Sequence, residues 1–270
     1  MNLATGAAAR GEERTRVTAV IPARRGATRL PDKPLRLLGG RPLVVRVLER
    51  VRALGVADRV LVATDDAQVR AVVEEAGGEA VLTRADHPSG TDRVAEVARA
   101  LGLPADAIVV NVQGDEPFVE GEAVQGAIDV VRDGVAPIGT VAVPAAVDAL
   151  ATPDVVKVVC DDAGRALYFS RAPIPFLRDA ADAAHRTSLV RQHLGVYAYR
   201  VDALARWVAL PPHPLELVEK LEQLRPLAAG LAIGVAVAAP PRFGGIDTEA
   251  DLARADEAWA TLTAVPSSLA

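Results

Sequence analysis

The feature that most constrains the fold of this chain is a repeated alternation of short runs rich in Val and Ile with longer segments of helical periodicity. The strand-like runs cover residues 17–21, 59–64, 79–83 and 107–112, and the helical segments that follow them cover 41–54, 66–77, 89–102 and 121–133. Such an alternation is typical of a mostly parallel sheet with helices on both faces. Gly77 and Gly102 stand where helix C-caps are expected and support two of the boundaries. The sequence therefore predicts an α/β fold built on a mostly parallel, Rossmann-like sheet.

The pattern changes after about residue 150. Two runs at 155–160 and 165–170, joined by the turn-like DDAG, are typical of a hairpin, and a further strand is expected at 193–200. We expect these strands to form an antiparallel lobe, inserted at about 150–200. The remaining expected elements are an amphipathic helix at 214–227 with Leu217, Leu221 and Leu224 on one stripe, a strand at 231–237 and a C-terminal helix at 248–262. We expect one domain over 17–262, a disordered tail at 1–16 and a second tail at 263–270.

Composition and charge narrow the classes of partner. Hydrophobic residues make up 50% of the chain, whereas aromatic residues make up only 3% and the formal net charge is −5 without a long block of one sign. These values argue against a nucleic-acid or anionic-membrane surface. No apolar run reaches the roughly 20 residues of a membrane span, and the first sixteen residues lack the apolar segment of a secretion signal. The single cysteine, Cys160, is expected to be a buried strand residue, and a reducing cytoplasm is the expected location.

A basic loop follows the first strand. Residues 19–34 read AVIPARRGATRLPDKP and contain neither the glycine-rich dinucleotide turn nor the P-loop pattern. The missing glycine-rich turn argues against a nicotinamide-dependent dehydrogenase. Because ligands of open α/β sheets bind beyond the carboxyl ends of the strands, Arg24 and Lys33 are candidates for holding a phosphate chain. The alternative is a solvated basic surface loop.

Three further segments carry candidate site residues. Asp115 in NVQGDEPF (111–118) follows a strand and suits a hard cation such as Mg²⁺, although a polar turn would use the same residues. Asp247 in GGIDTEADL (244–252) precedes a helix, where capping by Asp247 itself or by Thr248 is the simpler explanation. In RADHPSGTDRVAEV (84–97), Ser89 and Gly90 at a helix start suit either a close ligand or ordinary capping.

Taken together, seven stretches resemble one family, the 3-deoxy-manno-octulosonate (Kdo) cytidylyltransferases, also called CMP-Kdo synthetases. They are IPARRGATRLPDKPL, RADHPSGTDR, VQGDEPF, ALYFSRAPIPF, RQHLGVYAYR, LELVEKLEQLR and GGIDTEADL, and they follow the family's order from about residue 17 to about residue 255. The resemblance implies transfer of CMP from CTP to Kdo, with release of pyrophosphate, for lipopolysaccharide-type glycan synthesis. It also implies Mg²⁺ as cofactor, a fold of the nucleotide-diphospho-sugar transferase type and a homodimer. The inserted strands near 155–200 would then help to form the sugar site and the dimer contact.

The resemblance also implies roles for individual residues. Arg24, Lys33 and Asp115 would be catalytic, and Asp115 and Asp247 would bind Mg²⁺. The nucleotide would be bound by Ala23, Arg24, Arg29, Lys33, Ser89, Gly90, Gln113 and Asp115. The sugar would be surrounded by Arg93, Arg171, Gln192, His193, Tyr197, Glu222 and Gln223. The anomeric oxygen of the sugar would attack the α-phosphorus in line with departing pyrophosphate, a step that depends on positioning and on cations more than on a histidine base.

Three residues of the first motif depart from the family pattern. Arg25 stands where an aromatic or aliphatic residue is frequent, Ala27 stands where the family has serine, and Asp32 stands where it has glycine. Loss of the serine hydroxyl would remove one phosphate hydrogen bond, worth roughly 0.5–1.5 kcal/mol. Asp32 would weaken the cationic field around Lys33, and Arg25 would restore it. The alternatives that stay open are a cytidylyltransferase for a related acid sugar, such as amino-Kdo or a sialic-acid-like sugar, and a non-catalytic nucleotide-binding regulator.

Overall fold

A computed structural model of the chain describes residues 15–26, 29–145 and 147–264. Its central sheet has the order β11-β7-β10-β6-β1-β4-β5. The bounds are β11 Ile233–Val237, β7 Ile138–Pro144, β10 Arg191–Arg200, β6 Ile108–Asn111, β1 Val17–Ala23, β4 Arg59–Thr64 and β5 Ala80–Leu82. Neighbours pair in parallel except at β10, which is antiparallel to both β6 and β7. The predicted α/β fold with a mostly parallel sheet is therefore confirmed.

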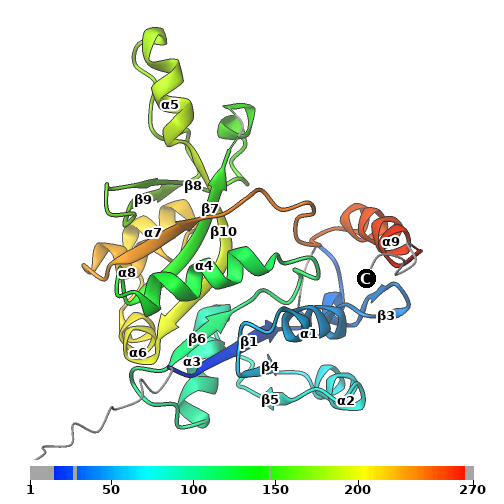
Figure 1. Cartoon of the computed structure of the whole chain (residues 1–270). Helices are drawn as coiled ribbons and strands as arrows, with labels where there is room; N and C mark the ends of the chain where they lie inside the picture. The colour runs from blue at the N-terminus through cyan, green and yellow to red at the C-terminus, as the bar shows by residue number, and fades with distance from the viewer. Residues whose placement is uncertain (1–14, 27–28, 146, 265–270) are drawn as a thin grey trace, which may run out of the picture.

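Helices cover both faces of this sheet (Figure 1). On one face lie α1 (Leu43–Leu54), α2 (Ala67–Glu75), α4 (Gly121–Arg132) and α9 (Glu249–Ala264), whose apolar side chains share one buried cluster. On the other face α3 (Gly90–Ala100), α6 (Val201–Ala209) and α8 (Leu224–Ala228) share a second cluster. Because each inner strand is covered on both sides, β1 and β6 are buried almost throughout and mainly apolar, with Thr18 and Asn111 as their polar residues.

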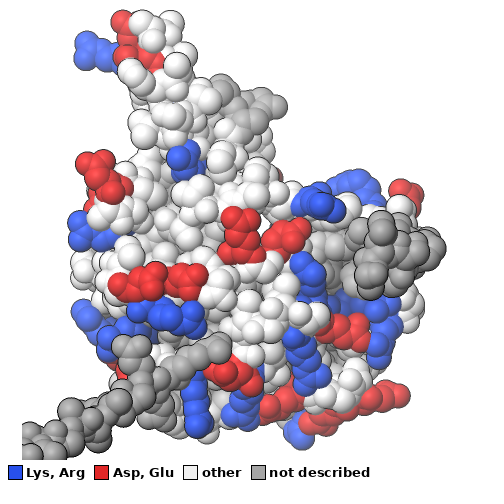
Figure 2. Space-filling view, in the orientation of Figure 1, with Lys and Arg blue, Asp and Glu red and all other residues white. Residues whose placement is uncertain are grey.

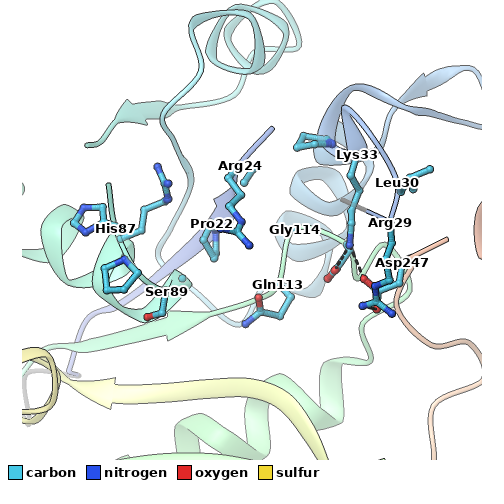
Figure 3. Close-up of a pocket in the computed structure, with 16 residues that line it drawn as sticks. Pro22, Arg24, Arg29, Leu30, Lys33, His87, Ser89, Gln113, Gly114 and Asp247 are labelled. Atoms are coloured by element: carbon cyan, nitrogen blue, oxygen red, sulfur yellow. Dashed lines mark hydrogen bonds and ion pairs between the residues drawn. The ribbon is translucent and has the colours of Figure 1, made fainter. Parts of the chain in front are cut away.

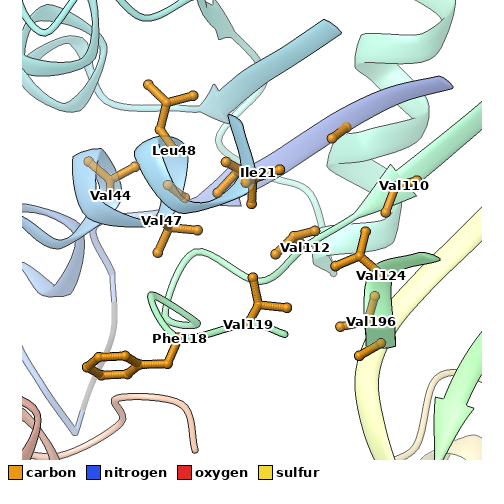
Figure 4. Close-up of a cluster of buried hydrophobic side chains, with 14 of the residues drawn as sticks. Ile21, Val44, Val47, Leu48, Val110, Val112, Phe118, Val119, Val124 and Val196 are labelled. Carbon is orange, nitrogen blue, oxygen red and sulfur yellow. The ribbon is translucent and has the colours of Figure 1, made fainter. Parts of the chain in front are cut away.

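The first cluster is built almost entirely from aliphatic side chains. Figure 4 shows Val47 and Leu48 of α1 near Ile21 of β1, with Val112 and Val124 farther along. Fully burying one side chain of this size contributes about 1.5–3 kcal/mol. Branched and small residues at these positions let the helices approach the sheet closely, which fixes the strand ends from which the functional loops leave.

The inserted segment contains the predicted hairpin. Strands β8 (Lys157–Cys160) and β9 (Ala166–Ser170) pair antiparallel, the turn between them contains Gly164 at φ 76°, and β8 also pairs with β10. Helix α5 (Ala183–Leu189) projects away from the body beyond this hairpin (Figure 1). Cys160 lies in the predicted strand but is half-buried rather than buried. The short remaining elements are β2 (Leu37–Leu38), β3 (Arg41–Pro42) and the 3₁₀ turns η1 (Lys33–Leu35), η2 (Val147–Ala151) and η3 (Ala180–Asp182).

Several elements differ from the sequence-based expectation. The predicted helix at 214–227 is wrong, because α7 (Pro214–Glu219) ends at Lys220, which adopts a left-handed φ of 54°, and α8 starts only at Leu224. Leu217 of the supposed apolar stripe is 53% exposed, whereas Leu221 and Leu224 are buried. Strand β7 and helices α5 and α6 were not predicted. Strand β10 is not confined to the inserted lobe, since it occupies the middle of the main sheet.

Two predicted helix ends agree with the structure, and most of the predicted terminal tails lie outside the described residues. Gly77 and Gly102 have φ values of 73° and 60° after α2 and α3, which confirms them as C-terminal glycines. Most of the predicted tail at 1–16, and residues 265–270 of the second tail, lie outside the described residues. None of the helices in the described part of the chain is long and apolar enough to cross a bilayer.

Candidate active site

A cavity of about 370 Å³ opens where the carboxyl ends of β1 and β6 meet the N-terminus of α3. Its walls are formed by Pro22, Ala23, Arg24, Arg29, Leu30, Lys33, Pro34, His87, Pro88, Ser89, Gly90, Arg93, Gln113, Gly114, Asp115 and Asp247. Figure 3 shows His87 and Ser89 on one side, Lys33 and Asp247 on the other, and Arg24 and Gln113 between them. All eight residues proposed for the nucleotide, and both proposed metal ligands, line this one cavity. Their roles stay predictions.

Parallel pairing explains why the two loops meet. Strand β1 pairs with β6 so that Val20 faces Asn111, and the chain leaves both strands at the same edge of the sheet. At the floor of the cavity, a Cβ on Gly114 would lie 2.7 Å from the carbonyl oxygen of Pro22. Only glycine allows this approach, which places Gln113 and Asp115 beside the basic loop.

The basic loop is joined to two carboxylates by one ammonium group. Lys33 Nζ lies 2.7 Å from Asp115 Oδ2 and 2.7 Å from Asp247 Oδ1, as the dashed lines in Figure 3 mark. Burial acts to lower the pKa of Lys33, but the charges and hydrogen bonds of Asp115 and Asp247 outweigh it, so that the pKa is raised. The Lys33 side chain is therefore a cation, and the point between the two carboxylates accommodates positive charge.

In the turn before α9, the residues that cap the helix are not the residue proposed as a metal ligand. Thr248 Oγ1 accepts a hydrogen bond from the Asp251 backbone at 3.2 Å, and Asp251 Oδ2 accepts one from the Thr248 backbone at 2.9 Å. This reciprocal pattern is a capping box. Because Thr248 and Asp251 cap the helix, the side chain of Asp247 is left to contact Lys33 and, at 3.0 Å, the guanidinium of Arg29.

A third carboxyl group, that of Glu116, is buried near Asp115 and Asp247. It was not among the predicted site residues. Burial, followed by the negative charges of Asp115 and Asp247, raises the pKa of Glu116 to about 8, and Lys33 opposes this only in part. Glu116 is therefore protonated at neutral pH and adds no negative charge. The sequence signal was the DEP triplet, but only the structure shows which of the two acids is buried.

The cations of the loop divide into paired and unpaired groups. Arg25 Nε lies 2.5 Å from Asp32 Oδ1 at the surface, and Arg25 also reaches Asp66 at 3.5 Å. Arg25 is thus paired with Asp32, and the effect of these two residues on the cationic field around Lys33 stays a prediction. Arg24 is exposed and, within the described residues, has no hydrogen bond or ion pair, which leaves its guanidinium to a ligand. The departure at Ala27 lies outside the described residues.

The opposite wall of the cavity is the start of α3. Ser89 is its N-cap, accepting from the Asp92 backbone at 3.2 Å, and also donates to Asp92 Oδ2 at 2.7 Å. A Cβ added to Gly90 would meet only the ring of Pro22 within 4 Å, at 3.4 Å or more. Ser89 therefore caps the helix, and Ser89 and Gly90 both line the cavity. His87, which gives no clear signal in the sequence, also lines the cavity with its ring against Glu96.

The residues proposed for the sugar fall into two groups. Arg93 lines the main cavity and is held there by Asp65, at 3.0 Å, and by Thr83. The other six, namely Arg171, Gln192, His193, Tyr197, Glu222 and Gln223, do not line it. Glu222 is connected to the cavity wall by a 3.0 Å hydrogen bond from Thr91 of α3. Arg171 donates to the carbonyl oxygens of Glu219 and Pro153 at 2.8 and 3.0 Å, so its guanidinium joins the inserted segment to α7.

The side chains of β10 form a buried polar group beside the cavity. His193 Nε2 lies 2.9 Å from Thr140 Oγ1, whose single hydroxyl proton is directed to the carbonyl oxygen of Val196 at 2.8 Å. His193 therefore donates through Nε2, and burial lowers its pKa to about 3, so the ring is neutral. The Tyr197 hydroxyl and Glu222 Oε2 are buried without a hydrogen-bond partner in the described structure. Such groups are satisfied by a polar ligand or by water.

The donor set fits one kind of metal ion. Within the described residues no group of three or more His, Cys, Asp and Glu side chains converges as a metal site. Two carboxylates do converge on the ammonium of Lys33, beside cations that suit phosphate oxygens. Mg²⁺ is typically held by one or two carboxylates together with substrate phosphates, so Asp115 and Asp247 fit that ion better than an ion with an all-protein ligand cage.

Comparisons with known proteins agree with this geometry. The sequence profile of the family described as Cytidylyltransferase matches residues 18–233. A 3-deoxy-manno-octulosonate cytidylyltransferase from Gemmatimonas aurantiaca is 64% identical over 252 residues, which cover 93% of this chain and 97% of that protein. The solved structure of a CMP:2-keto-3-deoxy-manno-octonic acid synthetase complexed with CTP has a TM-score of 0.85 and 39% identity, covering 92% of this chain and 100% of that one.

A more distant structure shows how widely the fold is shared. The 4-diphosphocytidyl-2C-methyl-D-erythritol synthase from Anaerococcus prevotii superposes with a TM-score of 0.59 over 92% of this chain and 99% of that one, at 16% identity. This likeness concerns the fold alone.

Proposed function

Because this chain belongs to the cytidylyltransferase family, and within it to the 3-deoxy-manno-octulosonate cytidylyltransferases, we propose that its 370 Å³ cavity transfers CMP from CTP to the anomeric hydroxyl of Kdo. The observation that carries this proposal is the convergence of Lys33, Asp115 and Asp247 within 2.7 Å contacts at the end of a basic loop. A pair of carboxylates next to an unpaired arginine is the charge pattern that a metal-bound triphosphate needs.

The basic loop supplies the groups for the triphosphate. Arg24 has no partner in the described structure, and Arg29 is 66% exposed despite its ion pair with Asp247, so both guanidinium groups can turn to phosphate oxygens. Lys33 is held more rigidly, with 14% of its side chain exposed. Ser89 and Gly90 at the start of α3 line the opposite wall, where the nucleoside would lie.

We assign Asp115 and Asp247 as the carboxylates that hold Mg²⁺. When bound, this ion neutralises charge that develops on the phosphate oxygens and favours ionisation of the sugar hydroxyl. Lys33 would then exchange part of its contact with the carboxylates for the triphosphate. Before a cation binds, burial and the charges of Asp115 and Asp247 raise the pKa of Glu116 to about 8, so Glu116 adds no negative charge beside them.

The reaction itself is one displacement at phosphorus. The anomeric hydroxyl loses its proton to water, and its oxygen forms a bond to the α-phosphorus while the bond to the β-phosphate oxygen breaks, so that CMP remains on the sugar and pyrophosphate leaves with its negative charge. Arg24, Arg29 and Lys33 stabilise that charge, and this electrostatic stabilisation contributes more than any proton transfer. His193 is neutral and its Nε2 is committed to Thr140, which agrees with a mechanism that needs no histidine base.

The sugar is proposed to lie between the main cavity and the polar group of β10. Arg93 at the cavity wall offers a cation for a carboxylate, while Tyr197 and Glu222 offer unsatisfied polar atoms for hydroxyl groups. Glu222 is linked to α3 through Thr91, so sugar contacts and nucleotide contacts share one helix.

We further propose that two copies of the chain associate through the projecting lobe. Phe176 and Val218 are each 83% exposed, and Leu167, Leu189 and Leu217 are each more than half exposed. Figure 2 shows few charged side chains around the base of the lobe. Isolated apolar residues are normal at a surface, but five large exposed ones on β9, the loop after it, α5 and α7 suit a self-complementary interface. Light scattering should give twice the chain mass at micromolar concentration, and Val218→Asp should give monomers.

The cellular setting follows from the proposed substrates. CTP is a cytoplasmic nucleotide, and we propose that the enzyme works in the cytoplasm and supplies CMP-Kdo for lipopolysaccharide-type glycans.

The proposal is tested by pyrophosphate release from purified protein with Mg²⁺, CTP and Kdo. ATP, GTP and UTP replace CTP in parallel reactions, and amino-Kdo and sialic acid replace Kdo. Release should require CTP, be fastest with Kdo and be lost in Asp115→Ala. Equal release with sialic acid would contradict the proposed sugar, and release that persists in Asp115→Ala would contradict the site.

A further inference from the structure

A second cavity, of about 350 Å³, is lined in part by residues that shortly follow Asp115 or shortly precede Asp247 in the chain. It is lined by Arg50, Pro117, Phe118, Glu120, Arg242, Phe243 and Trp259, and none of these residues lines the first cavity. Phe118 follows Asp115 by three residues, and Phe243 precedes Asp247 by four. The two loops are joined by a 2.9 Å hydrogen bond from the Ile246 backbone to the Asp115 carbonyl oxygen.

Three aromatic rings form one part of this second cavity. The ring centroid of Phe118 lies 4.7 Å from that of Phe243 and 5.7 Å from that of Trp259, at tilted angles. In Figure 4 the Phe118 ring points away from the aliphatic cluster formed by its neighbours. The whole chain has only four Phe, three Tyr and two Trp, yet two Phe and one Trp meet at this place. All three rings line the cavity, where Phe118 is 9% exposed and the Arg46 guanidinium lies over the Trp259 ring, 4.5 Å from its centroid. Aromatic surface that lines a cavity suits a planar apolar group.

Two guanidinium groups provide the polar part. Arg50 donates to the Val119 carbonyl oxygen at 2.8 Å and is paired with Glu120 at 3.3 Å, which leaves its position fixed and its charge balanced. Arg242 is exposed and has no hydrogen bond or ion pair to any residue in the described ranges. The cavity therefore has one positive charge in excess, on a side chain that is available to an anion.

We propose that this second cavity binds a small aromatic anion, with the planar ring against Phe118, Phe243 and Trp259 and the anionic group on Arg242. The three rings account for the planar aromatic part of this ligand, and the guanidinium of Arg242, unpaired within the described part of the chain, accounts for its negative charge. An entirely apolar ligand would leave Arg242 without a partner, and an inorganic anion would leave the aromatic surface open to water. The proposal concerns this site alone and does not depend on the reaction in the first cavity.

Phenyl phosphate is the probe, and Trp259 is the reporter. The only other tryptophan, Trp207, is 1% exposed in the second core cluster, so Trp207→Phe isolates the emission of Trp259. Phenyl phosphate should change this emission saturably. Inorganic phosphate, which lacks the ring, and benzyl alcohol, which lacks the charge, should each bind at least tenfold more weakly. Titration calorimetry on the unsubstituted protein repeats the measurement without reliance on the Trp207 variant.

Arg242→Ala should weaken the binding of phenyl phosphate at least tenfold, while Arg99→Ala should not change it. Arg99 is the matched control because it is another exposed arginine without a described side-chain partner, placed on α3. Equal affinity of the two variants would overturn the proposal, as would the absence of saturable binding. Binding that survives Arg242→Ala but is lost in Lys33→Ala would place the anion in the first cavity and would also overturn it.

Discussion

Lys33 Nζ lies 2.7 Å from Asp115 Oδ2, although 82 residues separate the two in the chain. The same ammonium lies 2.7 Å from Asp247 Oδ1, which is 214 residues away. One lysine thus joins the loop after β1, the loop after β6 and the segment before α9. Two carboxylates this close would repel each other, and the ammonium between them lets both stay ionised until a metal and a triphosphate arrive.

Lys33→Met should separate two effects of this lysine. Without nucleotide, the ammonium competes with a divalent cation for the same oxygens, so its removal should tighten Mn²⁺ binding about tenfold, equivalent to about 1.4 kcal/mol. Pyrophosphate release should fall about 100-fold, because the triphosphate loses a fixed cation. Free Mn²⁺ measured by electron paramagnetic resonance gives the first quantity. Unchanged or weaker Mn²⁺ binding would show that the carboxylates and the ammonium do not share the metal position.

Asp247→Asn should lower activity, whereas Thr248→Ala should lower stability. Asp247 contacts Lys33, whereas Thr248 caps α9 together with Asp251. Asp247→Asn should therefore lower activity about 100-fold at nearly unchanged stability. Thr248→Ala should lower the free energy of unfolding by about 1 kcal/mol and retain activity. Urea denaturation and the pyrophosphate assay measure the two quantities, and equal loss of activity in both variants would contradict this division.

Gly114→Ala should disturb the cavity floor. The added Cβ would lie 2.7 Å from the Pro22 carbonyl oxygen, so β1 and the loop after β6 must move apart. We expect a loss of about 1–3 kcal/mol in stability and a clear loss of activity, because Asp115 moves with its neighbour. Gly244→Ala is the control, since no atom lies within 4 Å of its Cβ position. Similar stability of the two variants would contradict the close approach.

His193 should make stability depend on pH. Burial lowers its pKa from 6.5 to about 3 in the folded protein, so between these values the unfolded chain binds a proton that the folded chain does not. Stability supplied by the neutral ring is complete above pH 6.5 and is lost as the pH falls toward 3. The slope from this one group approaches about 1.4 kcal/mol per pH unit. Denaturation at pH 7, 6 and 5 should show a smaller slope for His193→Gln, and an equal slope would contradict a neutral buried ring.

The parallel part of the fold could be predicted from the sequence because each strand there is a compact aliphatic run followed by a helix with clear spacing. Strand β7 could not, because Gly139 and Pro144 interrupt its pattern. The structure gives a reason for the glycine: a Cβ on Gly139 would lie 2.1 Å from the Ala127 carbonyl oxygen of α4. The helix at 214–227 looked continuous, and only the left-handed backbone at Lys220 divides it.

In the candidate site, too, the position of some residues could be predicted from the sequence and that of others could not. Residues after β1 and β6 and at the start of α3 could be predicted to lie together, because parallel strands end at one edge of a sheet. The sugar residues depend on how β10, α7 and the inserted lobe pack, which local spacing does not encode. Arg171, for example, is expected beside the sugar, and in the structure its guanidinium is held by backbone carbonyl oxygens.

The central claim is transfer of CMP from CTP to an acid sugar in the cavity around Lys33, Asp115 and Asp247, and ³¹P NMR of a reaction with Mg²⁺, CTP and Kdo tests it most directly. The account predicts that each CTP consumed gives one pyrophosphate and one phosphodiester signal, that nothing is consumed without Kdo, and that Asp247→Asn gives no detectable product in the same reaction time. Consumption of CTP without Kdo, or a phosphodiester that forms as fast in Asp247→Asn, would contradict it.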